Sequence, residues 1–184
     1  AITFDDGATH TWDETGDWPA NPIAEDVTIT GANTKLIITG DDPFVMTGDF
    51  IIEAGGVLDI ADGFGLGDSD PGFTLTGDIF VDGANSEFIV NWYVELDITG
   101  DIIVTSGGHV FMDGDLDLTI TGDILLDDSD METEDGIITI KGDIDLSTDS
   151  NLDIIDTEYC FVYDGANIHH YIELNEGTLT ANGA

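Results

Sequence analysis

The chain has 184 residues, of which 40 are acidic, against two lysines and no arginine, and its formal net charge is −38 at pH 7. Nucleic-acid-binding proteins neutralise phosphates with Lys and Arg, so this composition excludes that class, and it equally excludes electrostatic docking on an anionic membrane. No apolar run approaches the ~20 residues that span a bilayer, so no membrane insertion is expected. The acids alternate with Ile, Val and Phe, unlike a disordered acidic tail, which predicts one folded domain with a substantial core.

Residues 1–23 differ from the rest of the chain. They contain Trp12 and Trp18 and lack the repeat that follows. We interpret 1–23 as an N-terminal cap and 24–184 as one repetitive domain, because the end of a repetitive β-structure exposes an unpaired strand. The sequence starts at Ala1 without Met, which is consistent with removal of a signal peptide.

From residue 24 onward, apolar and polar residues alternate with the period of two that is typical of β-strands. The tripeptide Thr-Gly-Asp recurs within this pattern, with Lys in place of Thr in the last copy. Its Asp residues are 29, 23, 22 and 20 residues apart. The five copies end at Asp49, Asp78, Asp101, Asp123 and Asp143.

A two-residue hairpin loop at each Gly-Asp is one interpretation of the repeat. At Gly122-Asp123, however, such a loop would pair Ile120 with Leu125 and Thr119 with Leu126, so polar faces would oppose apolar faces. The alternation is unbroken if the strand continues through the glycine, and all five copies then share one phase. An inward Gly lets the backbone bend toward the core.

Long strands bent at an inward Gly, with a period of ~20–23 residues, predict an all-β parallel β-solenoid of about seven coils. We expect turns at five Gly-containing pairs, and an antiparallel β-sandwich is the alternative fold. The aromatic-rich stretch 159–179 is interpreted as a second cap or a docking surface. The expected turns are Gly55-Gly56, Asp82-Gly83, Gly107-Gly108, Asp113-Gly114 and Asp135-Gly136.

In a solenoid, equivalent residues stack, so the five repeat Asp residues are expected to form an outward column with a rise of ~4.8 Å. Neighbouring carboxylates at this distance repel one another by about 0.9 kcal/mol in water. Two lysines cannot offset this repulsion, so the column predicts either bound Ca²⁺ or screening by ambient salt. The sequence leaves these two possibilities open.

Two other acidic clusters are candidate Ca²⁺ ligands. Asp113, Asp115 and Asp117 have the D-x-D-x-D spacing of a calcium loop, without its Gly at the sixth position and its downstream Glu. Asp68 and Asp70 follow the Gly-rich residues 63–67, which resemble one turn of a calcium-binding β-roll.

Cys160 is the only cysteine. It is interpreted either as a small buried apolar residue or, in a secreted protein, as a candidate for a disulfide between two subunits.

We predict no enzymatic activity. The chain has no arginine, no G-x-S-x-G nucleophile motif and no phosphate loop. Carboxylate pairs at the separation used by glycosidases are uninformative when acids are this numerous.

Residues 9–12 (THTW), 16–20 (GDWPA) and 24–29 (AEDVTI) resemble the start of extracellular β-solenoid modules found in adhesins and autotransporter passengers. In composition, the chain is also similar to the acidic sheath proteins of methanogenic archaea. Either resemblance implies a structural role at the cell surface and supplies no functional residues.

These observations predict a non-enzymatic, extracellular structural subunit of a self-assembling filament, sheath or surface layer. Copies would join by strand stacking, with cations screening their acidic surfaces. The alternative is a monomeric adhesin-type module that binds a glycan or a protein.

Overall fold

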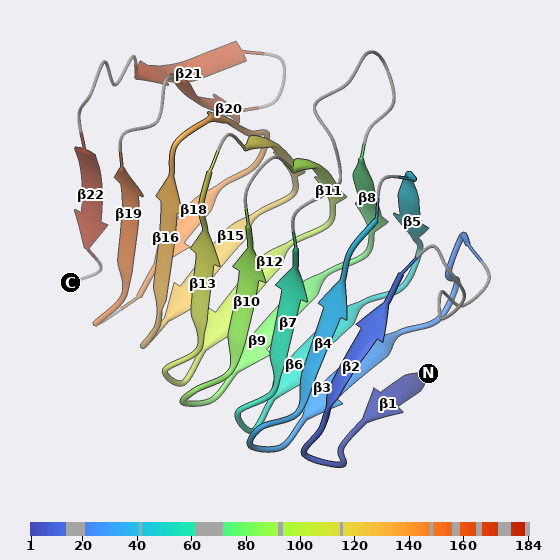
Figure 1. The fold of residues 1–184 in the computed structure, drawn as a ribbon. Helices are drawn as coiled ribbons and strands as arrows, with labels where there is room; N and C mark the ends of the chain where they lie inside the picture. The colour runs from blue at the N-terminus through green and yellow to red at the C-terminus, as the bar shows by residue number, and fades with distance from the viewer. Residues whose placement is uncertain are drawn as a thin grey trace.

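A computed structural model describes residues 1–13, 21–40, 42–61, 72–91, 94–114, 116–147, 149–155, 159–164, 167–172 and 178–182, the last three ranges in their backbone only. These residues form 22 β-strands, arranged as a parallel β-solenoid (Figure 1). The predicted fold class is therefore confirmed.

Three sheets, here called A, B and C, form the walls of the solenoid. Sheet A has the order β1 (Ile2–Phe4), β3 (Val27–Thr30), β6 (Phe50–Glu53), β9 (Ile79–Asp82), β12 (Ile102–Thr105), β15 (Ile124–Asp127) and β18 (Ile144–Leu146). Sheet B has the order β2 (Thr9–Trp12), β4 (Lys35–Ile38), β7 (Val57–Ile60), β10 (Glu87–Val90), β13 (His109–Met112), β16 (Asp130–Glu134), β19 (Asn151–Ile155) and β22 (Thr178–Asn182). Sheet C has the order β5 (Phe44–Met46), β8 (Phe73–Thr76), β11 (Glu95–Thr99), β14 (Asp117–Thr121), β17 (Ile137–Ile140), β20 (Tyr159–Asp164) and β21 (Asn167–Ile172).

Each coil contributes one strand to each sheet and pairs in parallel with the next coil. Six complete coils run from β3–β4–β5 to β18–β19–β20. They are preceded by an incomplete coil of β1 and β2, which pair with β3 and β4, while Ile23 forms a bridge to Met46. This parallel pairing supports the solenoid over the antiparallel sandwich.

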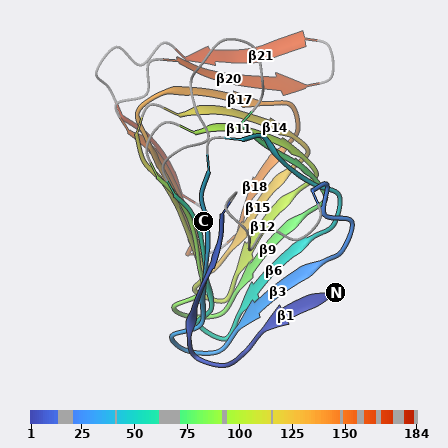
Figure 2. The ribbon, with the colours of Figure 1, turned by 45° about the vertical axis from the view of Figure 1, so that its right-hand side comes forward.

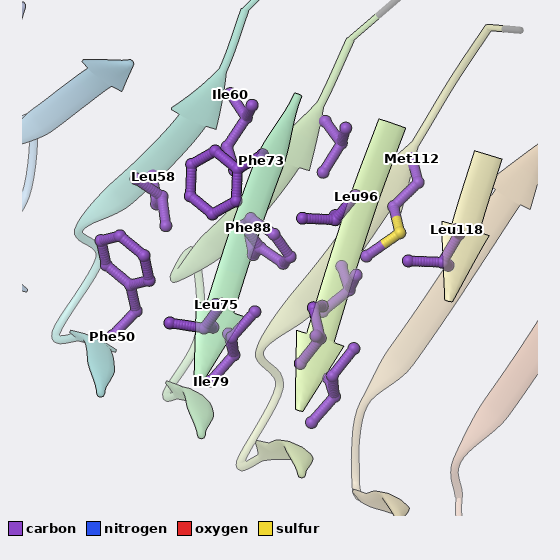
Figure 3. Packing of buried hydrophobic residues seen from close by; sticks show 14 of the residues in the cluster. Phe50, Leu58, Ile60, Phe73, Leu75, Ile79, Phe88, Leu96, Met112 and Leu118 are labelled. Atoms are coloured by element: carbon purple, nitrogen blue, oxygen red, sulfur yellow. The ribbon is translucent and has the colours of Figure 1, made fainter. Parts of the chain in front are cut away.

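The core fills the space between the three sheets, because inward positions are apolar on every level. Figure 3 shows Phe50, Phe73 and Phe88 among the buried Leu, Ile and Met side chains. The rings of Trp12, Phe44 and Phe73 follow one another along the axis, with centroids 6.4 and 4.8 Å apart. The buried aromatic rings of the described core therefore lie in its N-terminal half, where they pack among aliphatic side chains.

The repeat glycines stack where sheet C turns into sheet A, and adjacent coils approach closely there. A Cβ atom on Gly100 would lie 2.1 Å from the carbonyl oxygen of Gly77, and one on Gly122 would lie 2.1 Å from that of Gly100. Real Cβ atoms do not come this close, so this position requires glycine. The predicted alternation across the glycine is confirmed, because Ile120 and Ile124 on either side of Gly122 are both buried. The glycine itself was predicted to point into the core, but its missing side chain would point at the carbonyl of the preceding coil.

The corner between sheets A and B is a tight turn with left-handed residues. The N–H of Ser86 donates to the carbonyl of Gly83, and Asn85 lies at φ 67°. The Ser86 hydroxyl is buried, donates to the Asp82 carbonyl at 2.7 Å and accepts the N–H of Gly55 at 3.0 Å. Turns therefore bond to the preceding coil through side chains as well as through the backbone.

The corner between sheets B and C is the irregular one. The connection from β7 to β8 spans residues 61–72, whereas the connection from β16 to β17 spans only 135–136. Differences in coil length are thus concentrated at this corner, while the sheet registers stay constant.

The two ends of the stack differ (Figure 2). At the C-terminal end, β21 pairs antiparallel with β20, and β22 pairs antiparallel with β19. Sheets B and C are therefore closed by strands of reversed direction, whereas sheet A ends on β18, whose outer edge has no partner among the described strands. At the other end, β1 and β2 supply the first coil from within residues 1–23.

Candidate functional site

The five repeat Asp residues form a column along the corner between sheets C and A. Each follows a repeat glycine and directly precedes an inward residue of a sheet A strand, as Asp78 precedes Ile79. The parallel register of sheet A aligns the column. We call Asp49, Asp78, Asp101, Asp123 and Asp143 the Asp column.

One carboxylate oxygen of each column member except the last accepts a backbone N–H from the next coil. Oδ1 of Asp49 accepts the N–H of Asp78 at 2.9 Å, and Oδ1 of Asp78 accepts that of Asp101 at 2.8 Å. The same bond joins Asp101 to Asp123 and Asp123 to Asp143, each at 2.8 Å. Asp26 begins the series, because its Oδ1 accepts the N–H of Asp49 at 3.2 Å. The column therefore holds neighbouring coils together despite its like charges.

This hydrogen-bonding role was missed by sequence reasoning, which placed the Asp residues outward and considered only cations. The signal was the constant Gly-Asp order. A glycine that brings two backbones close together also brings the next amide within reach of the side chain that follows it. The second carboxylate oxygen of each column member, Oδ2, remains a candidate cation ligand.

The other candidate ligands do not form one visible site. Asp117 is on β14, and Asp113 follows β13 across the B–C corner, while Asp68, Asp70 and Asp115 lie outside the described residues. Within the described parts of the chain, no group of three or more His, Cys, Asp or Glu side chains is placed to hold a metal ion.

Cys160 lies in β20, where its backbone is opposite Ile138 on one side and Ile172 on the other. The position of its side chain is not among the described features of the structure.

Three carboxylates gather on the outer face of sheet C. Glu95 on β11 is opposite Asp117 on β14, and Asp97 follows two residues along β11. Partial burial, together with the charges of Asp117 and Asp97, raises the pKa of Glu95. Burial and the charge of Asp97 likewise raise the pKa of Asp117. Glu95 and Asp117 therefore hold their protons more tightly than free carboxylates do.

The outer face of sheet A carries a row of apolar side chains, which we call the apolar stripe. Its members are in register on four consecutive strands and point away from the core, since their neighbours along each strand are buried. Leu125 is 36% exposed, and the other three are partly exposed. The members are Ile51, Phe80, Ile103 and Leu125.

Acidic side chains border the apolar stripe on both sides, except at Thr105 on β12. The Asp column lies two residues before it on each strand. Two residues after it lie Glu53, Asp82, Thr105 and Asp127, which we call the distal column. Hydrogen bonds from the hydroxyls of Thr105 and Ser106 lower the pKa of Asp82, so this carboxylate stays ionised.

Sheet B carries a partly buried ion pair on its outer face. Lys35 Nζ lies 2.6 Å from Oδ2 of the buried Asp59, and Asn91 Nδ2 donates to Asp59 Oδ1 at 2.6 Å. One of the chain's two lysines therefore already forms an ion pair within the chain. Sequence reasoning missed this pair because its members are on different coils.

Comparison with protein-family models, with curated protein sequences and with solved structures gives no match. The described residues include no helix long and apolar enough to cross a membrane.

Proposed function

We propose that this chain is a non-enzymatic structural subunit of an extracellular assembly, in which copies join end to end through sheet A. The observation that carries the proposal is the match between the two terminal strands of that sheet. β1 and β18 are the first and last strands of sheet A, and neither has a partner on its outer edge among the described strands.

The inward residues of these terminal strands are apolar and only partly covered. Ile2 and Phe4 pack on the core at one end, and Ile144 and Leu146 pack on it at the other. If β1 of one copy pairs with β18 of the next, each exposed pair covers the other. Burying apolar area in this way favours association.

Backbone groups at both edges are oriented for such pairing. The N–H of Ile2 donates to the Asp26 carbonyl at 2.8 Å, so the alternation directs the N–H of Thr3 away from β3. On β18, the N–H of Ser147 donates to Leu126 at 2.9 Å, which directs the N–H of Leu146 away from β15.

The reversed strands β21 and β22 restrict this contact to sheet A. They occupy the next level of sheets C and B, where a further copy would otherwise place its own coil. Consecutive copies therefore cannot continue one straight three-sheet stack. Each copy also brings a formal charge of −38, so assembly requires cations, either condensed salt or Ca²⁺.

The test compares Thr3→Pro with Thr3→Val. Proline removes the outward N–H and keeps the bonds of β1 to β3, whereas valine keeps the N–H and changes an exposed side chain. Negative-stain electron microscopy and sedimentation velocity in millimolar Ca²⁺ are expected to show assemblies for the native chain and for Thr3→Val, and monomers for Thr3→Pro.

The same measurements in EDTA separate specific cation bridging from general screening. Loss of assembly in EDTA at constant ionic strength would place Ca²⁺ at the contact. Monomers of the native chain in both solutions would refute the proposal and favour the monomeric adhesin-type module.

A further inference from the structure

The outer face of sheet A combines a central apolar row with acids on both sides. The apolar stripe ends at Thr28 on one side and at Asp145 on the other, because these residues occupy the same register on β3 and β18. It is therefore bounded in every direction by polar side chains. An exposed apolar row within such an acidic chain indicates a binding surface.

The dimensions of the face suit one α-helix lying along the solenoid axis. The stripe spans three strand spacings, about 14 Å, which corresponds to about three helical turns of 5.4 Å. Outward residues two apart on a strand are about 6.7 Å apart, so the two acidic borders are separated by about 13 Å. A helix with its side chains has a diameter of about 10–12 Å, so side chains on both its flanks can reach the acids.

The charges of the face determine which helix fits. The described residues of sheet A present no Lys, Arg or His on this face. Lys35 is paired with Asp59 on sheet B, and Lys141 follows β17 of sheet C, so a second copy would oppose acids with acids. A partner must instead bring cations on both sides of an apolar row.

We propose that the outer face of sheet A binds a basic amphipathic α-helix of another protein. The apolar residues of the helix pack on Ile51, Phe80, Ile103 and Leu125. Its Lys and Arg side chains on one flank reach the Asp column, and those on the other flank reach the distal column. In the Asp column, the Oδ1 atoms are held by backbone amides, which fixes the position of the carboxylates that meet the partner.

The probe is a synthetic peptide of Leu and Lys, about 14–18 residues long, with Leu on one face at the helical period. Fluorescence anisotropy measures its binding, and circular dichroism measures its conformation. The native chain is expected to bind the peptide and to induce helical signal, which the all-β solenoid itself does not contribute. A peptide of the same composition with Leu and Lys in scrambled order is expected to bind at least about tenfold more weakly, because its Leu residues share no face.

Matched variants locate the site. Phe80→Ser removes the largest member of the stripe, and Phe111→Ser removes an outward phenylalanine of sheet B as the control. We expect Phe80→Ser to weaken peptide binding about tenfold and Phe111→Ser to leave it unchanged. The pair Glu53→Gln and Asp82→Asn is expected to weaken binding several-fold and to reduce its dependence on salt concentration.

Equal weakening by Phe80→Ser and Phe111→Ser would overturn the proposal, as would equal binding of the scrambled peptide. If Phe80→Ser instead changes the sedimentation of the chain alone, the stripe pairs copies with one another and the helix proposal is wrong. These outcomes are independent of Thr3→Pro, which tests the strand edge and leaves the stripe intact.

Discussion

The Oδ1 atom of Asp78 accepts the backbone N–H of Asp101 from the next coil at 2.8 Å. A charge-assisted hydrogen bond and a like-charge contact thus occur between the same two residues. The bond acts over a short range and resists salt, whereas the repulsion between the carboxylates is screened by salt. Substitutions that separate these two effects are therefore informative.

Replacing Asp101 by Ala is expected to lower the free energy of unfolding by about 1–2 kcal/mol, because the N–H of Asp123 loses its acceptor. Asp101→Asn keeps an oxygen acceptor and removes one charge from the column, so we expect it to be neutral or stabilising at low salt. Urea denaturation at low and high NaCl measures both effects. If Asp101→Asn were as destabilising as Asp101→Ala at low salt, the negative charge would stabilise the fold through the hydrogen bond more than it destabilises the fold through repulsion.

Gly100→Ala is expected to destabilise the fold by at least about 3 kcal/mol or to prevent folding, since the new Cβ would lie 2.1 Å from the Gly77 carbonyl oxygen. Gly83→Ala is the matched control. Gly83 has φ 92°, but its nearest neighbours are 3.9 Å from a built Cβ, so only backbone strain of about 1 kcal/mol is expected. Thermal unfolding followed by circular dichroism compares the two. Similar losses for both variants would mean that the coils separate easily at the repeat glycines.

The raised pKa values of Glu95 and Asp117 predict a gain in stability on acidification. A carboxyl whose pKa is higher in the folded state binds its proton more tightly there. Its contribution is full below the unfolded pKa and is lost as the pH rises through the folded pKa. We therefore expect stability to increase as the pH falls from neutrality toward the ordinary carboxyl range.

Glu95→Gln should weaken this pH dependence, because it removes both a shifted group and a charge beside Asp117. Urea midpoints across this range measure the effect. Asp82 has the opposite sign, since its lowered pKa contributes stability that is lost as the pH falls through the folded value. An unchanged slope in Glu95→Gln would show that the cluster on sheet C does not carry the dependence.

Lys35→Met is expected to cost about 2 kcal/mol, because the buried Asp59 carboxylate then loses its only ion-pair partner in the described structure. Adding Asp59→Ile should recover most of this loss, since the outward positions beside it in the register are Ile37 and Ile89. Chemical denaturation of the single and double variants measures the coupling. A double variant no more stable than Lys35→Met would mean that Asn91, left without its acceptor, limits the recovery.

Local pattern was sufficient to predict much of the fold. The alternation through Gly122 placed Ile120 and Ile124 on one inward face, and the recurrence of this unit predicted the solenoid. These inferences work because a strand's two faces are determined by residues two apart. The expected turns at Gly55-Gly56 and Gly107-Gly108 also correspond to the A–B corner.

Other features depend on pairing between coils, and no local pattern encodes it. The bond from Asp101 to Asp123 needs the coil spacing, and the pair of Lys35 with Asp59 needs the register of sheet B. The antiparallel direction of β21 and β22 likewise depends on the strands with which they pair. The apolar stripe had a signal, since Ile51 and Phe80 are apolar at positions that the alternation assigns to the outside.

At the corner between sheets B and C, the length of the connection changes from coil to coil without changing the register of the strands. Although the connection before β8 spans 61–72, Phe73 still aligns with Phe44 on one side and with Leu96 on the other. A chain built this way can gain or lose whole segments at one corner during evolution without rearranging its core. The same corner is the place where a foreign peptide could be grafted and displayed, with the cost of the graft limited to closing a longer loop.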